Sequence, residues 1–380
     1  MSSRRGVIFH GYYGQRNAGD DTFARVASKI AEDLEVKRFG FTAPRAPWEE
    51  LNIPGRAIYP DRARFPGHLR TRVLAATVAA GTSVFFGGST IFQRQRALDD
   101  QMALVRIARV RLHGCGISVG PFRTSEDEAR VARYLARFDT LSVRDRSSFE
   151  RVASLAPGIE LTQGFDPAVL LPEFDRPHPP LEKKSRGVKP IIGVSICGTE
   201  TRGGNPRADA LRFDTVRCLV NRTALLTGAQ VRLIVMNGHP KHGDASITAE
   251  FARRLDPAID VEVVPYSPDT RVLIRAISEC TAVVAMRLHA GIFGFATGVP
   301  VLFSAYHQKS VDFAEIAGYP KRVLTNPDDA AAAWRDHETL LAMLEGHDRE
   351  SYMPTLSILA ARGLADRGVQ PLRSALIGKS

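Results

Sequence analysis

The chain has 380 residues, enough for two domains. Its 44% hydrophobic and 24% charged residues are typical of a globular protein and exclude wholesale disorder. The formal net charge of +10 favours anionic partners, such as an acidic substrate or an anionic membrane surface. Nucleic acid is not an expected partner, because no zinc finger, RNP-like motif or basic heptad region occurs.

The four cysteines lie far apart and form no CxxC pair, which argues against a disulfide scaffold and fits a reducing compartment. No signal peptide is apparent, because the basic first six residues run directly into a strand-like segment. Residues 73–92 are uncharged and long enough to span a membrane, but glycines and hydroxyl residues interrupt them. We therefore predict a helix end, a turn and a buried strand there. The predicted location is the cytoplasm, either in solution or at the inner face of the membrane.

In the first half, short apolar runs alternate with helical patterns, which is typical of parallel βαβ units. Asp20 stands at the expected N-cap of the first helix. Ser125, with Glu128 three residues later, predicts a capping box for another helix. The expected strands are at 6–14, 36–41, 83–88, 115–120 and 140–146, and the expected helices at 20–34, 103–114 and 125–138.

A proline-rich and charged segment at 175–190 interrupts this alternation, which then restarts. We predict an N-terminal Rossmann-like domain at 1–175, a linker at 176–190, a second Rossmann-like domain at 191–329 and a helical tail at 330–380. Both domains are expected to be doubly wound α/β folds with a cleft between them. The expected strands of the second half are at 190–197, 231–237, 261–267, 282–287 and 299–306, and the helices at 213–228, 268–280 and 288–298.

Ligands of such folds bind beyond the carboxyl ends of the strands, which directs attention to the loops there. The first of these loops, GYYGQRNAGDD at residues 11–21, has glycines that allow close approach of the backbone to a ligand. Asp20 and Asp21 would repel an anion, so a sugar hydroxyl is the expected ligand. A well-capped loop without a ligand explains the same residues equally well.

Two further candidates follow strands of the first half. Gly87 and Gly88 form either a closely packed turn or a ligand contact. Arg144 either pairs with Asp145 or faces the cleft. A surface ion pair contributes less than about 1 kcal/mol, so it is a weak reason to place an arginine there, and we favour a cleft role for Arg144.

The most specific pattern is AMRLHAGIFGFATGVPV at residues 285–301. It places Arg287 and His289 where a buried strand meets an apolar helix, whose N-terminus offers unpaired N–H groups to an anion. A bound anion would also compensate the Arg287 charge. A core histidine bonded to a carbonyl remains the alternative for His289. Downstream, His307 and Lys309 follow the next expected strand, and Lys309 could hold a phosphate as a point charge.

With these motifs the sequence resembles the polysaccharide pyruvyl transferase family. The matching pieces are, in chain order, GYYGQRNAGDD, FFGGSTIF, GISVGP, SVRDRSS, FDPAVLLP, MRLH and GVPVLFSAYHQK. The resemblance implies a glycosyltransferase-B-like pair of domains. It implies transfer of pyruvate from phosphoenolpyruvate onto two hydroxyls of a sugar in a bacterial cell-wall or exopolysaccharide precursor, with release of phosphate. The acceptor in this family is often lipid-linked.

By matching position, Arg287, Leu288 and His289 carry the donor-binding motif and Arg144 is the second arginine. The remaining expected substrate contacts are Lys309, Asn17, Gly19, Gly87 and Gly88. We predict that His289 moves protons, because a group titrating near neutrality suits the chemistry. Arg287 is predicted to neutralise the donor, and Asp20 to position or deprotonate an acceptor hydroxyl.

We expect no cofactor beyond phosphoenolpyruvate as donor, and no metal, because no metal-ligand spacing occurs in the sequence. Activity is therefore expected in the presence of a chelator. Two alternatives remain open at this point. One is a nucleotide-sugar-dependent glycosyltransferase of the same fold, and the other is a non-catalytic relative that binds glycans.

Overall fold

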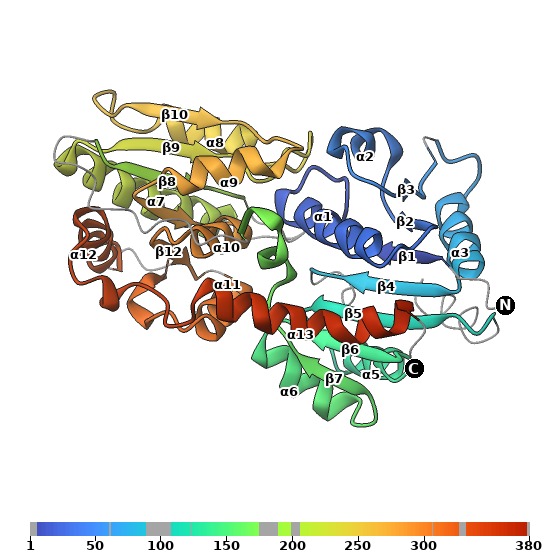
Figure 1. Cartoon of the computed structure of the whole chain (residues 1–380). Coiled ribbons are helices and arrows are strands. Elements are labelled where there is room, and N and C mark those ends of the chain that lie inside the picture. Colours follow the sequence, from blue (N-terminus) through green and yellow to red (C-terminus); the bar gives the residue numbers. More distant parts are fainter. Residues whose placement is uncertain are drawn as a thin grey trace. The chain divides into compact units, whose positions relative to one another are not determined.

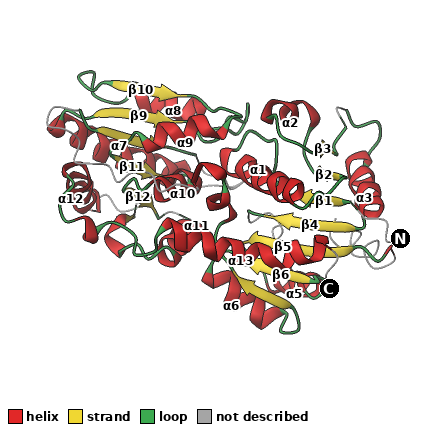
Figure 2. Cartoon of the chain, in the orientation of Figure 1, coloured by secondary structure: helices red, strands yellow, loops and turns green. Residues whose placement is uncertain are grey.

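The computed structural model describes residues 6–60, 62–88, 108–122, 124–174, 189–198, 206–305, 307–326 and 332–377. The chain divides into two compact units (Figure 1). Unit 1 comprises Met1–Leu171 and Ala361–Ser380, and unit 2 comprises Pro172–Ala360. In each unit the strands, yellow in Figure 2, form one sheet with helices around it. This is the α/β class predicted from the alternation of strand and helix patterns.

Unit 1 contains a seven-stranded sheet in the order β3-β2-β1-β4-β5-β6-β7, and all its pairs are parallel. The strands are β1 (Val7–His10), β2 (Phe39–Phe41), β3 (Arg56–Ala57), β4 (Thr82–Phe86), β5 (Arg111–Ile117), β6 (Thr140–Val143) and β7 (Glu160–Gln163). Its helices are α1 (Ala18–Asp33), α2 (Arg45–Leu51), α3 (His68–Ala80), α5 (Ser125–Leu135), α6 (Arg146–Leu155), the short 3-10 helix η1 (Pro167–Leu170), and α13 (Ile358–Ile377), whose first three residues belong to unit 2.

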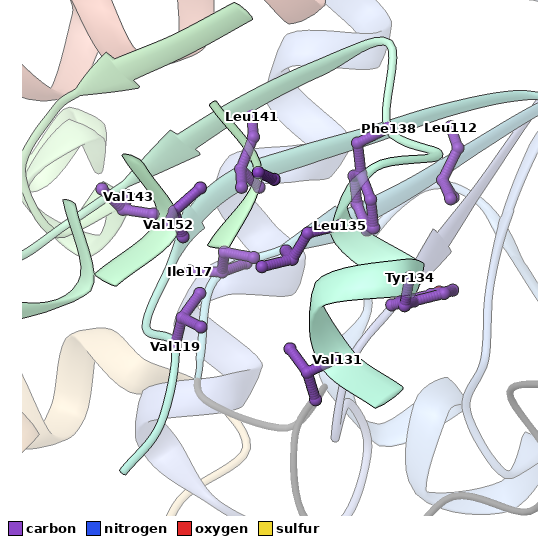
Figure 3. Close-up of a cluster of buried hydrophobic side chains, with 11 residues drawn as sticks. Leu112, Ile117, Val119, Val131, Tyr134, Leu135, Phe138, Leu141, Val143 and Val152 are labelled. Carbon is purple, nitrogen blue, oxygen red and sulfur yellow. The ribbon is translucent and has the colours of Figure 1, made fainter. Parts of the chain in front are cut away.

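A buried apolar cluster beside β5 and β6 fixes the strands that carry the later motifs of unit 1 (Figure 3). The helix α5 contributes Leu135, which lies beside Ile117 of β5, and Tyr134, whose ring lies 5.2 Å from the ring of Phe138. The last residues of β5 and β6, Ile117 and Val143, belong to this cluster, so the polar residues that follow them are held in defined positions. The cluster consists of Leu112, Ile117, Val119, Val131, Tyr134, Leu135, Phe138, Leu141, Val143, Val152 and Ala156.

Two local predictions in unit 1 are wrong. The helix expected at 103–114 does not include its last four residues, because β5 begins at Arg111 and pairs with β4. Residues 103–107 lie outside the described part. The N-cap of α5 is Thr124, whose hydroxyl accepts from the amide of Asp127, so Ser125 is the first helical residue rather than the cap.

The uncharged stretch from residue 73 forms the end of α3, a left-handed turn at Gly81 and then β4, as predicted. Residues 89–92 of this stretch lie outside the described part. Among the helices that the structure describes, none is both long and apolar enough to cross a membrane.

Unit 2 contains a six-stranded parallel sheet in the order β10-β9-β8-β11-β12-β13. Its strands are β8 (Ile191–Ser195), β9 (Gln230–Ile234), β10 (Val261–Val264), β11 (Ala282–Ala285), β12 (Val301–Ser304) and β13 (Leu324–Thr325). Its helices are α7 (Pro206–Thr227), α8 (Ala245–Arg253), α9 (Thr270–Ser278), α10 (Leu288–Thr297), α11 (Gln308–Ile316) and α12 (Ala332–Glu345), with the 3-10 helices η2 (Pro172–Phe174), η3 (Lys321–Val323) and η4 (Arg349–Ser351).

The expected helical tail from residue 330 contains the helices α12 and α13 and is divided between the two units. Helix α12 belongs to unit 2, whereas most of α13 belongs to unit 1. Most of the predicted linker, residues 176–188, lies outside the described part.

Helix α10 packs unusually close to its sheet because it contains two glycines. A Cβ atom at Gly291 would collide with the ring of Phe303, and one at Gly294 with the side chain of Val301. Both neighbours belong to β12, so these glycines set the position of α10 over that strand. In each sheet the strand order reverses beside the first strand, between β1 and β4 and between β8 and β11. Ligands of open α/β sheets bind beyond the carboxyl ends of strands at such points.

Candidate active site

Arg287 immediately precedes the helix α10, at the point where the strand order of unit 2 reverses. It is the N-cap residue, with extended backbone angles and no side-chain cap on the helix. Its backbone N–H donates to the Ser195 hydroxyl over 3.1 Å, and the Met286 N–H donates to the Ser195 carbonyl over 3.0 Å. These bonds join the strand-to-helix junction to the end of β8. The first-turn N–H groups of α10 therefore lie where a ligand is expected.

The Arg287 side chain forms a bidentate ion pair with Asp244. Its Nε lies 3.0 Å from Asp244 Oδ2 and its Nη2 lies 2.5 Å from Oδ1. Both side chains are withdrawn from solvent, at 11% and 1% exposure. The prediction that a bound anion compensates the Arg287 charge is therefore incomplete, since Asp244 compensates it within the chain. What the pair adds is a fixed orientation of the guanidinium plane.

Asp244 was not predicted from the sequence. It ends the segment between β9 and α8, where its Oδ2 also accepts a hydrogen bond from the backbone N–H of Asn237 over 3.0 Å. The side chain of Asn237 in turn accepts from the backbone N–H of His239 and donates to the His242 carbonyl, so hydrogen bonds within this segment hold its shape. The sequence signal is NGHPKHGD after a buried strand, a turn-rich segment that ends in a carboxylate.

His289 and Leu288 occupy the first turn of α10, and both are half-buried. The His289 ring lies 6.4 Å from the ring of Phe293, and its Nε2 atom is enclosed by protein. The structure therefore places the histidine beside the helix N-terminus, as the sequence predicts, with one edge of its ring against the apolar helix.

Lys309 lies in the first turn of α11, which follows β12, and is half-buried. Strands β11 and β12 are parallel neighbours, so α10 and α11 begin at the same edge of the sheet. His307 is the N-cap of α11, and its Nδ1 accepts from the Lys309 amide over 3.3 Å. Unit 2 thus brings Arg287, His289 and Lys309 to the carboxyl ends of neighbouring strands.

In unit 1, the predicted N-cap of α1 at Asp20 is wrong. The helix begins at Ala18, and Asn17 is the cap, with its Oδ1 accepting from the Gly19 amide over 3.2 Å. Asn is as good an N-cap as Asp, and the sequence offers both. Asn17 and Gly19, predicted as substrate contacts, thus have a structural function in the cap. Asp20 lies in the first turn of the helix and is half-buried.

The loop that precedes α1 is anchored by two buried side chains. The Gly14 amide donates to Asp21 Oδ1 over 2.9 Å. The Tyr13 hydroxyl lies 2.7 Å from the Phe86 carbonyl and 3.0 Å from the His10 carbonyl. Burial raises the pKa of Tyr13 well above its ordinary value, so the phenol stays protonated. The loop is therefore preformed at the ends of β1 and β4, with Asp20 beside it.

Gly87 and Gly88 form a closely packed turn. Both have positive φ, 70° and 77°, and a Cβ at Gly87 would collide with the ring of Phe23. Gly87 N–H donates to the Cys115 carbonyl, and the Gly88 carbonyl accepts from Ser118 N–H. Packing and pairing with the segment of β5 thus explain this diglycine; whether it also contacts a ligand stays a prediction.

Arg144 does not pair with Asp145. It is 7% exposed and its Nη1 lies 2.6 Å from Asp166, which is 2% exposed. Its Nε donates to the Ser118 hydroxyl over 2.8 Å, and its guanidinium lies over the Phe23 ring. Asp145 instead caps α6 by accepting from the Ser148 amide. Three of the matched motifs, SVRDRSS, FDPAVLLP and GISVGP, therefore meet around one buried guanidinium.

Arg144 belongs to unit 1, and Arg287 and Lys309 to unit 2. Of the two arginines predicted to bind the donor, unit 2 thus contributes Arg287 alone. Within the described ranges, no group of three or more His, Cys, Asp or Glu side chains is placed to hold a metal ion. Burial raises the pKa of Cys115 to about 12, which excludes this thiol as a nucleophile near neutral pH.

Two parallel-stranded α/β units of this kind define a glycosyltransferase-B-like protein, which is the predicted fold. Solved structures share it. A putative UDP-N-acetylglucosamine 2-epimerase from Listeria monocytogenes is 12% identical with a TM-score of 0.62, covering 100% of this chain and 98% of its own. The UDP-N-acetylglucosamine 2-epimerase from Neisseria meningitidis is 9% identical with a TM-score of 0.61, covering 97% and 98%. At these identities the likeness concerns the fold alone.

A trehalose 6-phosphate synthase from Burkholderia multivorans has the same architecture, at 11% identity and a TM-score of 0.54, covering 99% of this chain and 100% of its own. No curated protein matches the sequence. The family model of the polysaccharide pyruvyl transferases matches residues 17–308, which is most of the chain. The chain therefore belongs to the polysaccharide pyruvyl transferase family. Asn17 begins the matched range, and Lys309 lies one residue beyond its end.

Proposed function

We propose that this transferase moves pyruvate from phosphoenolpyruvate onto two hydroxyls of one sugar in a cell-wall or exopolysaccharide precursor. One sugar oxygen bonds to the central carbon of the donor, whose methylene group takes up a proton and becomes a methyl group. A second sugar oxygen then displaces the phosphate. Of the two protons that the sugar gives up, one is on the new methyl group and the other leaves with phosphate. The product is a cyclic ketal.

The observation that carries the proposal is the junction of β11 and α10. Arg287 is held in a fixed plane at a helix N-terminus that has no side-chain cap, and His289 lies in the same turn. Phosphoenolpyruvate carries a carboxylate and a phosphate on three carbons, so it needs several donors close together. Helix N–H groups, a guanidinium and the Lys309 ammonium on the next helix are suited to two such anionic groups.

His289 is the proposed proton carrier. The first step needs a proton at the methylene carbon and must remove one from the attacking hydroxyl, and imidazole performs both near neutral pH. The apolar side of α10 behind the ring, including Phe293, limits the access of water from that direction. Arg287 stabilises the negative charge of the donor and of the leaving phosphate.

The acceptor is assigned to unit 1, with Asp20 beside the preformed loop at the end of β1. A carboxylate there accepts a hydrogen bond from a sugar hydroxyl and orients or deprotonates it. It would not bind the anionic donor, because the two acidic groups of this turn repel anions. Free and lipid-linked sugars both present the hydroxyl pair that the reaction requires.

Phosphate release tests the reaction. The enzyme is incubated with phosphoenolpyruvate and a panel of free and lipid-linked glycans, with and without a chelator. We expect release that depends on one class of glycan, with a mass gain of the acceptor equal to a pyruvate ketal, and unchanged by the chelator. His289→Ala should lower kcat by about 10²–10⁴-fold. The matched control is His347→Ala, because His347 is exposed and lies far along the chain in unit 2.

Ligand stabilisation tests the donor separately from the acceptor. Phosphoenolpyruvate at about 100 times its dissociation constant should stabilise the protein by about 2.7 kcal/mol, and UDP-N-acetylglucosamine should not. The nucleotide sugar is included because a structure of the Neisseria epimerase is described as bound to it. Stabilisation by the nucleotide sugar alone would favour a glycosyltransferase. Binding of phosphoenolpyruvate without phosphate release on any glycan would favour a non-catalytic binding protein.

A further inference from the structure

A basic and apolar surface lies on unit 1, outside the proposed active site. It consists of residues 62–72, the loop before α3 and the first turn of that helix, and we call it the 62–72 surface. Ten of its eleven residues are exposed, and His68 is half-buried. Helix α3 follows this loop and leads through Gly81 into the amino end of β4 (Figure 1).

The charge of this surface has one sign. Four arginines fall within eleven residues: Arg62, Arg64, Arg70 and Arg72. No aspartate or glutamate occurs in the sequence from residue 62 through residue 88. The surface is thus complementary to a dense array of negative charges, and each arginine adds its own attraction to such an array.

Large apolar side chains stand among these arginines. Phe65 is 50% exposed and Leu69 is 43% exposed, and Val78 is exposed further along α3. The helix buries only Val73, Thr77 and Ala80. An aromatic ring and a leucine held out in water beside arginines are the side chains that insert into the boundary between lipid headgroups and acyl chains.

The loop is held in shape by its own contacts. The His68 N–H donates to the Phe65 carbonyl over 3.1 Å, and His68 Nδ1 accepts from the Arg64 N–H over 3.1 Å. The rings of Phe65 and His68 lie 4.7 Å apart. Gly67 caps α3 with a φ of 84°, where an added Cβ would meet no neighbouring atom. The exposed ring is therefore presented by an ordered turn.

We infer that the 62–72 surface docks the protein on an anionic lipid bilayer. The alternation of arginine with exposed phenylalanine and leucine favours a bilayer over an acidic protein or RNA. A bilayer takes up apolar groups between its headgroups, whereas an RNA backbone would leave Leu69 in water. The inference does not depend on the proposed reaction, because none of these residues belongs to the proposed donor or acceptor site.

Vesicle sedimentation tests this inference with the full chain. The vesicles contain either phosphatidylcholine alone or phosphatidylcholine with about a third phosphatidylglycerol. We expect binding to the anionic vesicles only. Arg62→Ala with Arg64→Ala should weaken binding by about 30-fold, since each arginine near an anionic surface contributes about fivefold. The matched control, Lys321→Ala with Arg322→Ala, removes the same charge from exposed positions in unit 2 and should bind as the wild type does.

A second variant separates insertion from simple attraction. Phe65→Ser with Leu69→Ser keeps every charge and should weaken vesicle binding by about tenfold, with the loss persisting at high salt. All variants should melt at the wild-type temperature, because these side chains are exposed. Equal binding by the arginine variant and its control would overturn the inference. So would equal binding to neutral vesicles, or binding to a polyanion such as single-stranded RNA that depends on the same arginines while vesicles stay unbound.

Discussion

Arg287 and Asp244 form a buried ion pair that joins the starts of α10 and α8, the helices that follow β11 and β9 in unit 2. The guanidinium uses Nε and Nη2 on the two carboxylate oxygens, and the carboxylate also accepts from the Asn237 amide. A guanidinium held on two points cannot rotate about its own axis. Asp244 therefore sets the direction in which Arg287 meets a ligand, without itself being a group that attracts an anion.

Asp244→Asn is expected to raise the KM for phosphoenolpyruvate at least about tenfold. Arg287 would no longer be held in one plane and would make a weaker charge-assisted hydrogen bond to the donor, and such a bond is worth about 1.5–3 kcal/mol. The value of kcat should change less, since His289 is not touched. Asp244→Ala leaves a nearly buried guanidinium without its carboxylate and should also destabilise the protein by about 3–5 kcal/mol. Steady-state kinetics and urea unfolding measure the two effects.

Glu279→Gln is the control for this pair. Glu279 lies 2.9 Å from Arg232, another largely buried arginine of unit 2, at the far end of α9 from the proposed site. It should leave the KM unchanged. An Asp244→Asn enzyme with the wild-type KM would show that the pair only holds the two loops together.

Arg144 and Asp166 are expected to depend on each other in unit 1. Arg144→Ala leaves the buried Asp166 carboxyl group without its ion-pair partner, which should cost about 3–5 kcal/mol in the free energy of unfolding. Asp166→Ala should cost a similar amount. The double variant should lose clearly less than the sum of the two, because neither charge is then left alone. Urea unfolding of the four proteins measures this coupling, and strict additivity would contradict it.

Much of the fold follows from sequence periodicity, because parallel strands buried on both faces read as short apolar runs between helical patterns. The exception at β5 shows the limit. Its first residue, Arg111, continues a run in which Arg106 and Arg109 have helical spacing, but residues 111–115 pair in register with β4, and that pairing between distant segments decides the structure. The shortest elements, such as β3 and β13, have two residues each and leave no pattern to recognise.

The candidate site was predictable in its position but not in its partnerships. Arg287, His289 and Lys309 follow buried strands, and the rule for open sheets places them at one edge. The carboxylates that hold the arginines are not deducible in this way. Asp244 lies 43 residues from Arg287, and Asp166 lies 22 residues from Arg144, so only the folded chain shows the pairs.

Gly87→Ala is expected to destabilise unit 1 for two reasons. Its φ of 70° is unfavourable for alanine by about 1–2 kcal/mol, and the added methyl group collides with Phe23, whose ring supports Arg144. Together with about 1–3 kcal/mol for overpacking, a loss of at least about 2 kcal/mol should appear in urea unfolding. Gly158→Ala is the control, because a Cβ there meets no neighbouring atom and the backbone needs no left-handed conformation. Equal stability of the two variants would contradict the packing described for this turn.

His10 and His113 should make the stability of unit 1 fall in mild acid. Burial lowers the pKa of each from 6.5 to about 4, and for His113 the opposing influence of Asp139 is smaller. Between these two pH values the unfolded chain binds the protons and the folded chain does not. The free energy of unfolding is therefore highest above about pH 6.5 and declines as the pH falls to about 4, by up to about 1.4 kcal/mol per pH unit for each histidine.

Urea unfolding between pH 7.5 and 4.5 measures this decline. A variant with His10→Gln and His113→Gln should be less stable at pH 7.5, because it disturbs the stacking on Phe85 and the hydrogen bond to Thr140, yet its stability should depend much less on pH. His347→Gln should keep the full wild-type slope, since His347 is exposed in both the folded and the unfolded chain. If the double variant retained that slope as well, other groups would have to bind the protons.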